Sequence, residues 1–225
     1  MEWRNIILRI SVVVTTYNGK MHLEKQLLSL LQQERAPDEV LIFDDGSTDG
    51  TIELVQSFIR KNCLESWQFY VNAKRKGWKQ NFMEGLRKAA GDILFPCDQD
   101  DIWYPKKLAE MTAVMEQHPE IKLLACDYRV IYESGALKAT VYKKTPAETQ
   151  GLITRYGFTK HFFMNPYPGC TYAVRRDFFD AVKELWFDGS PHDEFLWLMA
   201  AVQDGAWFYN RVLMDYVRYS DNASG

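Results

Sequence analysis

The sequence predicts an α/β fold with a mostly parallel central sheet flanked by helices. In the first half of the chain, short apolar runs alternate with stretches whose apolar residues recur at helical spacing. The runs are apolar throughout, and not only at every second position. A strand of that kind is covered on both faces, which is typical of a parallel sheet between helical layers.

The expected elements follow one another in strand–helix order. A strand over 11–14 precedes a helix over 22–33, in which Leu23, Leu27 and Leu30 lie on one face. The order then recurs three times, as strand 40–43 with helix 51–60, strand 67–71 with helix 79–90, and strand 93–97 with helix 105–117. The second half is less regular, with a strand over 122–132, a polar stretch over 133–150 that we interpret as a loop, and a helix over 194–202.

Composition limits the classes of protein to consider. The 225 residues, 47% hydrophobic and 25% charged, describe a globular chain with enough apolar residues for a core. A net charge of -3 gives no broad positive surface, so nucleic acid is not an expected partner. Cys63, Cys97, Cys126 and Cys170 are too far apart for a Cys-x-x-Cys metal site and are typical of reduced thiols in a cytosolic protein. The apolar run 10–14 is too short to cross a membrane.

A cluster of acids directly follows the expected strand 93–97. Asp98, Gln99, Asp100 and Asp101 are consecutive, and neighbouring carboxylates repel one another unless a cation or another partner neutralises them. Ligands of parallel sheets bind beyond the carboxyl ends of the strands. The polar stretches that follow the expected strands are 15–18, 44–47, 72–77 and 98–101. Together they predict the site of an enzyme.

Three of these stretches carry a family resemblance. Residues 14–18 (Val-Thr-Thr-Tyr-Asn), 44–51 (Asp-Asp-Gly-Ser-Thr-Asp-Gly-Thr) and 98–108 occur in the order seen in glycosyltransferase family 2, and weaker matches continue through 168–173 and 192–193. The chain resembles most the rhamnosyltransferase-type members of polysaccharide assembly. The resemblance implies a GT-A fold in one domain, with a nucleotide-sugar-binding half (1–104) and an acceptor-side half (105–225). It also implies a UDP- or dTDP-sugar donor, Mn²⁺ or Mg²⁺, and inversion at the anomeric carbon.

The resemblance assigns the donor side. Asp100 is the expected metal ligand, and Asp98 contacts the ribose or the metal. A hard cation held by carboxylates stabilises the charge that grows on a departing diphosphate. The residues expected to hold the nucleotide are Thr15, Tyr17, Asn18, Asp44, Asp45, Lys76 and Asp98. Three plainer interpretations stay open: an ordinary turn at 44–47, a solvated charge run at 74–79, and a helix-capping role for Asp101.

The acceptor side is expected around Asp193. Inversion needs a carboxylate base on the face opposite the leaving group, and Asp193 follows the acid cluster in the order the family shows. Capping of the following helix is the alternative for Asp193, and a structural role is expected for His192. Gly169 and Cys170 match a family segment on the acceptor side, although a tight turn would also explain them. Trp103 is the aromatic residue that we expect to stack on a sugar in the substrate cleft.

The C-terminal segment departs from the subgroup, because Tyr219 stands where a His often completes the metal or diphosphate site. A tyrosine cannot act as a neutral imidazole ligand, so we expect weaker cation binding or a larger role for Arg218. The chain also stops where relatives often continue, so an acceptor-contacting or membrane-contacting element is expected to be absent.

The function expected from these residues is sugar transfer to a saccharide or lipid-linked saccharide hydroxyl, in the cytoplasm and in peripheral contact with the inner face of the cell membrane. A module that binds nucleotide sugars without turnover and a nucleotidyltransferase are the alternatives. A nucleotidyltransferase would carry a Gly-rich basic loop after the first strand, where this chain has Thr15, Thr16, Tyr17 and Asn18. A phosphohydrolase with an Asp nucleophile would carry Asp-x-Asp-Gly-Thr there.

Overall fold

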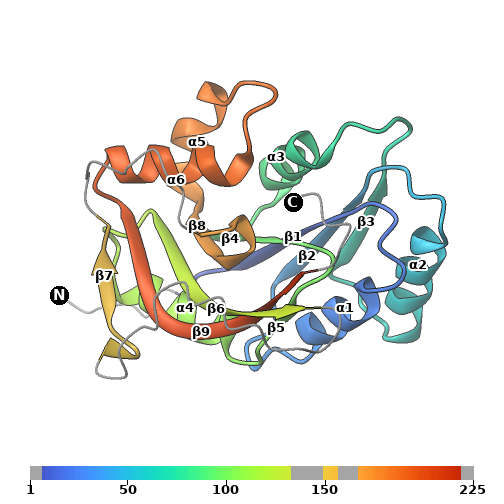
Figure 1. Ribbon diagram of the computed structural model, residues 1–225, viewed down its shortest axis with the longest axis horizontal. Coiled ribbons are helices and arrows are strands. Elements are labelled where there is room, and N and C mark those ends of the chain that lie inside the picture. The colour runs from blue at the N-terminus through green and yellow to red at the C-terminus, as the bar shows by residue number, and fades with distance from the viewer. Residues whose placement is uncertain (1–6, 133–148, 157–166, 219–225) are drawn as a thin grey trace.

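A computed structural model describes residues 7–132, 149–156 and 167–218. Its centre is a 9-stranded sheet in the order β3-β2-β1-β4-β8-β6-β9-β5, with β7 paired to β9 (Figure 1). None of the helices in these ranges combines the length and the apolar character that a membrane span requires.

The first half has the predicted parallel strand–helix order. Its strands are β1 (Ile10–Thr16), β2 (Glu39–Asp44), β3 (Trp67–Val71) and β4 (Ile93–Cys97), and its helices are α1 (Leu23–Leu31), α2 (Thr51–Lys61) and α3 (Trp78–Lys88). β1 pairs in parallel with β2 and β4, and β2 pairs in parallel with β3. The expected strands and helices of this half are therefore confirmed.

The second half extends the same sheet with mixed pairing. Its elements are β5 (Ile102–Trp103), α4 (Lys107–Gln117), β6 (Leu123–Tyr132), β7 (Ile153–Arg155), β8 (Tyr172–Arg175), α5 (Arg176–Val182), α6 (His192–Val202) and β9 (Ala206–Arg218), with 3₁₀ turns at Gly169–Thr171 and Lys183–Leu185. β8 runs antiparallel between β4 and β6, whereas β6 and β9 are parallel. The expected strand over 122–132 and helix over 194–202 are confirmed. The sequence analysis did not anticipate β5, β7, β8, α5 or β9.

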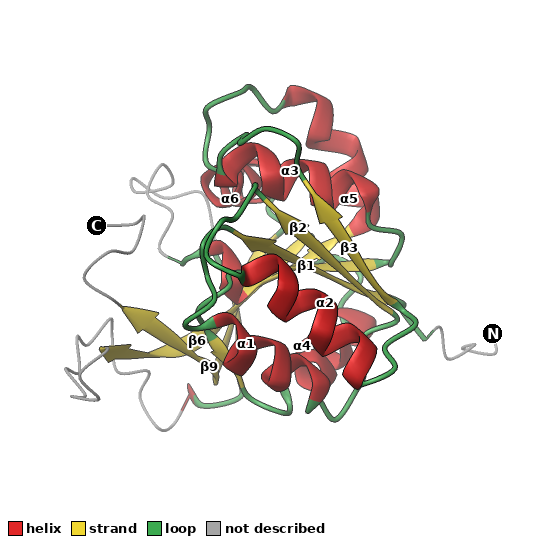
Figure 2. Ribbon diagram, turned by 90° about the vertical axis from the view of Figure 1, so that its right-hand side faces the viewer, coloured by secondary structure: helices red, strands yellow, loops and turns green. Residues whose placement is uncertain are grey.

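The apolar side chains form one core on each face of the sheet. Successive residues of β1 point to opposite faces, so that Val12 and Val14 contact one core and Val13 the other. Helices α1, α2 and α4 cover the first face, and α3, α5 and α6 cover the second (Figure 2). Three of the four cysteines, Cys97, Cys126 and Cys170, are buried free thiols, as expected, and Cys63 is exposed.

The topology gathers several chain segments at one edge of the sheet. β1, β2 and β4 all end there, because they are parallel. β8 runs the opposite way, with Arg175 opposite Ile93, so the turn that precedes β8 lies near the end of β4. The end of β9 reaches the same edge, where the backbone N–H of Val217 donates to Asp101 at 3.3 Å.

Candidate active site

The loop after β2 is built around the buried carboxylate of Asp44. Its Oδ1 accepts the backbone N–H groups of Gly46 (3.0 Å) and Ser47 (2.7 Å), and its Oδ2 accepts the hydroxyls of Thr16 (2.7 Å) and Ser47 (2.6 Å). An aspartate that binds backbone donors two and three residues ahead stabilises a tight turn. Asp44 therefore shapes the loop with both oxygens, as the ordinary-turn interpretation requires.

Asp45 connects that loop to the segment before α3. Its Oδ1 accepts the backbone N–H of Lys76 at 2.7 Å and the side-chain amide of Asn72 at 3.0 Å, and its Oδ2 accepts the backbone N–H of Gly77 at 2.8 Å. Gly77 has a φ of 85°, a value that favours glycine. The buried Asp45 therefore fixes the point at which α3 starts.

The loop after β1 is held by the acid cluster and by the loop after β2. The side-chain amide of Gln99 accepts the N–H of Tyr17 at 2.9 Å and donates to its carbonyl oxygen at 3.2 Å. Asn18 donates its N–H to Ser47 Oγ at 2.8 Å and accepts the N–H of Thr48 at 2.9 Å. Thr15 lies largely buried within β1. The predicted nucleotide residues of the first two loops are thus brought together.

The basic stretch before α3 has a different arrangement from the expected one. Lys76 Nζ pairs with Glu84 at 2.5 Å, and Lys79 Nζ donates to the carbonyl oxygen of Gly189 at 2.5 Å. The guanidinium of Arg75 lies 3.9 Å from the centre of the Tyr17 ring, within the range of a cation–π contact. Arg75, which the sequence analysis did not single out, is therefore the cation that lies over a predicted nucleotide residue.

The acid cluster extends beyond its own loop. Asp98, Asp101 and Cys170 each place a potential ligand atom within 4.8 Å of the others. Asp101 is 1% exposed, its Oδ1 accepts the N–H of Val217, and its Oδ2 has no hydrogen-bond partner among the described residues. Because α4 begins only at Lys107, Asp101 does not cap it. The carboxylates of Asp98 and Asp101 fit a hard divalent cation, whereas the thiol of Cys170 does not, and Asp100, the expected metal ligand, is not part of this group.

Crowding changes the protonation of the cluster. Burial, with added repulsion from Asp100 and Asp193, raises the pKa of Asp98 to about 7. Burial and the charges of Asp98 and Asp100 raise the pKa of Asp101 well above its usual value. Burial also raises the pKa of Asp100, although the charges of His22 and Arg218 oppose that shift. The turn that contains Gly169 and Cys170 connects this cluster to Asp193, because Cys170 belongs to the cluster and Gly169 packs against Asp193.

A buried lysine lies beneath the cluster. Lys107 is fully buried, and its Nζ donates to the carbonyl oxygen of Cys170 at 2.5 Å and lies 3.8 Å from the centre of the Trp103 ring. Its charge lowers the pKa of Asp98 and of Asp101. A lysine at the start of a helix is usually exposed to solvent. The sequence therefore gave no indication that Lys107 is a buried cation next to the acid cluster. Trp103 is 2% exposed, and the expectation that it stacks on a sugar is wrong because the indole packs in the core.

Asp193 lies in the first turn of α6, beside Gly169. The helix begins at His192 after Pro191, so Asp193 is not its N-cap residue. A Cβ atom added to Gly169 would lie 2.5 Å from His192 Nε2 and 3.1 Å from Asp193 Cβ. The missing side chain at position 169 therefore lets the start of α6 pack against this turn. In this structure the glycine allows a close approach of α6, whereas the sequence analysis expected it on the acceptor side.

His192 is enclosed by aromatic rings. It stacks on Phe82 with ring centres 4.1 Å apart, and Trp78 meets it edge-on at 5.9 Å. It is 3% exposed, and neither ring nitrogen has a hydrogen-bond partner in the described ranges. Burial lowers its pKa, so the imidazole is neutral at pH 7, in agreement with the structural role expected for it.

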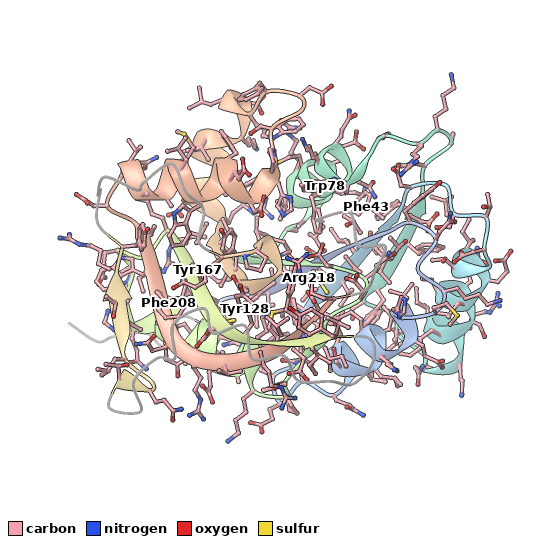
Figure 3. All side chains as sticks on the ribbon, viewed as in Figure 1. Phe43, Trp78, Tyr128, Tyr167, Phe208 and Arg218 are labelled. Atoms are coloured by element: carbon pink, nitrogen blue, oxygen red, sulfur yellow. The ribbon has the colours of Figure 1, made fainter. Side chains whose placement is uncertain are left out.

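Two expectations concern residues at the limit of the structure. Tyr219 and most of the polar stretch 133–150 lie outside the described residues. Arg218 is the last described residue, its guanidinium lies 4.9 Å from the centre of the Tyr216 ring, and Figure 3 shows it at the end of β9. Its charge lowers the pKa of Asp100, which agrees with a position near the cluster.

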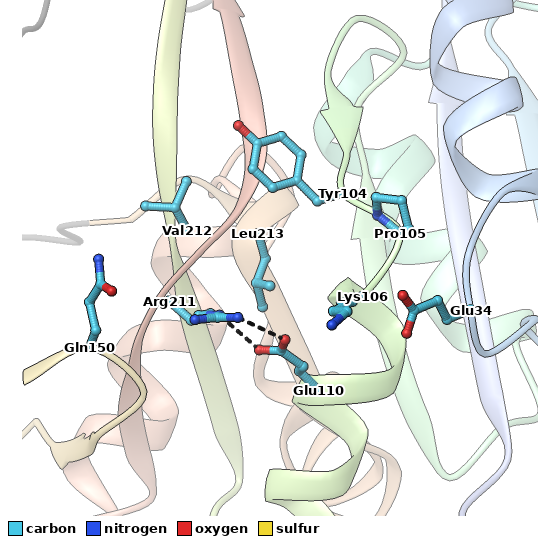
Figure 4. Close-up of a pocket in the computed structure, with 9 residues that line it drawn as sticks. All are labelled: Glu34, Tyr104, Pro105, Lys106, Glu110, Gln150, Arg211, Val212 and Leu213. Carbon is cyan, nitrogen blue, oxygen red and sulfur yellow. Dashed lines mark hydrogen bonds and ion pairs between the residues drawn. The ribbon is translucent and has the colours of Figure 1, made fainter.

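A separate pocket of about 340 Å³ lies between the start of α4 and β9 (Figure 4). An ion pair of 3.2 Å between Arg211 and Glu110 crosses its floor. No residue of the predicted site lines it.

We compared the chain with known protein families and with curated proteins. A family profile described as "Glycosyl transferase family 2" matches residues 11–181. The "dTDP-rhamnosyl transferase RfbG" of Shigella flexneri is 24% identical over 228 residues, covering 94% of this chain and 73% of that protein. The "Poly(ribitol-phosphate) beta-N-acetylglucosaminyltransferase TarS" of Staphylococcus aureus is 28% identical over 159 residues, covering 68% of this chain and 26% of that protein.

Solved structures show the same fold at low sequence identity. S. aureus TarS 1-349 in complex with UDP-GlcNAc has a TM-score of 0.74 at 18% identity, and the match covers 95% of this chain and 60% of that one. The mannosyltransferase PcManGT of Pyrobaculum calidifontis, in complex with GDP-Man and Mn²⁺, has a TM-score of 0.66 at 19% identity, covering 96% and 58%. The chain thus spans less than two thirds of either solved protein.

Proposed function

The chain belongs to glycosyl transferase family 2 and has the GT-A fold, and from that premise we propose that it is an inverting, divalent-metal-dependent enzyme. It moves a sugar from a UDP- or dTDP-linked donor to a saccharide or lipid-linked saccharide hydroxyl. The assembly of a cell-surface polysaccharide, at the inner face of the membrane, is the process it serves. The observation that carries the proposal is that one turn contacts both sides of the site: Cys170 groups with Asp98 and Asp101 at the end of β4, and Gly169 packs against Asp193.

The donor side consists of the three loops that follow β1, β2 and β4. Thr15 and Tyr17 frame the base, Asn18 also belongs to the nucleotide site, and Asp44 and Asp45 hold the loops in place through the hydrogen bonds described above. Of the basic stretch, Arg75 is placed over Tyr17, whereas Lys76 is engaged with Glu84. The names of the relatives support a nucleotide sugar: one is called a dTDP-rhamnosyl transferase, and TarS was solved with UDP-GlcNAc.

Asp98 and Asp100 are the proposed metal ligands. A bound Mn²⁺ or Mg²⁺ supplies positive charge that stabilises the diphosphate leaving group. The cation would also relieve the repulsion that raises the pKa values of the cluster. Mn²⁺ in the related PcManGT structure supports this assignment.

Asp193 is the proposed base. Its carboxylate takes the proton of the acceptor hydroxyl while that oxygen bonds to the anomeric carbon, and the bond from that carbon to the diphosphate oxygen breaks. Attack from the face opposite the leaving group inverts the anomeric centre. Gly169 and His192 position Asp193, because Gly169 packs against the first turn of α6 and His192, the first residue of that helix, stacks on Phe82.

A nucleotide and metal titration tests the proposal. UDP, dTDP and GDP are titrated with and without Mn²⁺ into the wild type, Asp100→Ala and Asp193→Asn, and into Glu53→Gln on α2 as an exposed acidic control. We expect Asp100→Ala to lose the Mn²⁺-dependent part of binding. Asp193→Asn should bind normally and lose transfer activity by roughly 10²–10⁴-fold.

Three results would contradict the proposal. No nucleoside diphosphate binds, or both variants retain full activity, or the sugar is released as a sugar phosphate, which would indicate nucleotidyl transfer. Tight binding of nucleotide sugars with no donor hydrolysis in the wild type would favour a binding module without turnover.

A further inference from the structure

We propose that Trp78 is a stacking platform for the acceptor saccharide, next to Asp193. The inference rests on the proposed function and names a binding residue for its acceptor. The sequence analysis assigned this task to Trp103, which the core encloses.

Trp78 differs from the other tryptophans of the described ranges. Trp67, Trp103 and Trp197 are buried, Trp186 and Trp207 are partly buried, and Trp78 is 42% exposed. Single exposed apolar residues are common on protein surfaces, so exposure alone identifies no site. The position and the neighbours of this indole carry the argument.

The position of Trp78 is fixed from the donor side. It is the first residue of α3, directly after Gly77, whose N–H donates to Asp45 Oδ2 at 2.8 Å. Asp45 belongs to the loop after β2, so one carboxylate holds both a donor loop and the backbone that carries the indole. Figure 3 shows Trp78 beneath α3.

The indole of Trp78 contacts His192, the residue directly before the proposed base. The indole meets His192 edge-on, with ring centres 5.9 Å apart, and His192 is adjacent to Asp193 in the first turn of α6. A sugar ring that lies on the exposed part of the indole is therefore close to the residue that would deprotonate its hydroxyl. This is the geometric requirement for an acceptor site.

The imidazole next to the indole is enclosed by protein. His192 is 3% exposed, it stacks on Phe82 with ring centres 4.1 Å apart, and its Nε2 lies against Gly169, where an added Cβ atom would be 2.5 Å away. Its buried ring therefore supports one edge of Trp78. The exposed part of the indole is the surface that is left for a ligand, and aromatic surfaces commonly line the sites of small molecules.

A second segment completes the rim around Trp78. Lys79 Nζ donates to the carbonyl oxygen of Gly189 at 2.5 Å and lies 5.6 Å from the centre of the Trp78 ring. This bond brings the turn over 187–190, which precedes α6, to the start of α3. The rim thus joins the segment before the donor helix to the segment before the proposed base.

The test separates saccharide contact from donor chemistry. Saturation-transfer NMR measures contact with the methyl glycosides of glucose, galactose, mannose and N-acetylglucosamine, with and without UDP and Mn²⁺. Donor hydrolysis without acceptor is measured in parallel. The variants are Trp78→Ala, Trp78→Phe and Leu31→Ala, the last being a control on α1, at the other face of the sheet, with a similar exposed fraction of 41%.

We expect contact with at least one glycoside in the wild type and at least a 10-fold weaker apparent affinity in Trp78→Ala. Trp78→Phe should stay within about 3-fold of the wild type, because an aromatic face remains. Leu31→Ala should match the wild type. Donor hydrolysis should stay within about 2-fold in Leu31→Ala, and thermal unfolding checks that each of the three variants is folded.

Defined results would overturn the inference. They are no contact with any glycoside in the wild type, unchanged affinity in Trp78→Ala, or an equal loss in Leu31→Ala. A loss of vesicle binding or of self-association in Trp78→Ala, with glycoside contact intact, would show that the indole serves another partner. If the wild type fails to hydrolyse any donor, the proposed function fails, but glycoside contact still decides the role of Trp78.

Discussion

The carboxyl group of Asp98 binds its proton more tightly in the folded chain than in the unfolded chain. Burial and the charges of Asp100 and Asp193 raise its pKa from 3.8 to about 7. Between these two values the folded state binds more protons, so its stability falls as the pH rises through that range. Above about pH 7 the full cost of ionising Asp98 is present. Sites that concentrate charge for function commonly reduce stability in this way.

Asp98→Asn should therefore stabilise the protein at pH 8. The amide has a similar shape but carries no charge, so it removes the repulsion from Asp100 and Asp193. We expect the melting temperature at pH 8, without divalent cations, to rise by roughly 3 °C or more, and the gain to shrink toward pH 4. Differential scanning calorimetry across this range measures the effect, with Asp188→Asn as the exposed control. A gain that is the same at every pH would contradict the assignment of the pKa to Asp98.

Gly169→Ala should slow sugar transfer without weakening nucleotide binding. The new Cβ atom would lie 2.5 Å from His192 Nε2 and 3.1 Å from Asp193 Cβ, so the start of α6 must move. Because misplacement of a catalytic group by about 1 Å can cost roughly 10²-fold in rate, we expect kcat to fall by about that factor. Steady-state kinetics and UDP titration of the same sample measure the two properties. Full activity in Gly169→Ala would show that α6 adapts without moving Asp193.

At the scale of whole elements, Asp45 connects β2 to the start of α3. Asp45→Asn replaces one acceptor oxygen by an NH₂ group, which faces the N–H of either Lys76 or Gly77. We expect a loss of about 1–3 kcal/mol in the free energy of unfolding, because a buried donor loses its partner. Urea denaturation measures this loss. If Asp45 instead serves the nucleotide alone, stability will be unchanged and only nucleotide affinity will fall.

The sequence predicted those elements whose signal is local. Every strand and helix of the first half follows from a short apolar run and a helical repeat, and the order of the motifs placed the polar loops at one edge. β9 was missed although it has 13 residues, because its buried positions do not alternate. It shifts register against β6 near Cys126 and Asp127, and its burial depends on β5, β6 and β7.

At the site, too, the sequence predicted what local motifs specify and missed what depends on distant contacts. The roles of Asp98 and Asp193 were predicted as members of ordered motifs. Lys107 is buried against Cys170 and Met214, and Trp103 pairs with Met214 of β9, so the burial of both depends on residues that are distant in sequence. A pattern of neighbouring residues contains no information about such contacts.

At the scale of the whole molecule, two consecutive arginines connect helices on opposite faces of the sheet, and the second of them, Arg176, links the two halves of the chain. Arg175, at the end of β8, donates to the carbonyl oxygens of Met115 (2.7 Å), His118 (3.3 Å) and Ile121 (2.9 Å), at and beyond the end of α4. Arg176 donates to the carbonyl oxygens of Leu86, Ala89 and Gly91, at and beyond the end of α3. The last carbonyl groups of a helix need such partners. Because α3 and α4 cover opposite faces of the sheet, this pair joins both layers to β8.

Arg176→Met tests whether the chain folds as the single domain that we propose. The substitution removes the guanidinium of Arg176, which belongs to 105–225. The carbonyl oxygens at the end of α3, which belong to 1–104, then lose their hydrogen-bond donors. We expect the free energy of unfolding to fall by about 2–3 kcal/mol, and Arg60→Met, at an exposed position of α2, to change it by less than about 0.5 kcal/mol. If the sheet unfolds as one unit, circular dichroism and tryptophan fluorescence will follow coincident urea transitions, both shifted to the same extent. If the two halves are independent domains, the wild type will show two transitions. The hydrogen bonds of Arg176 join the halves, and its ion pair within the second half, with Asp180 at 3.9 Å, is long and near the surface. Its loss would then leave both transitions near their original midpoints.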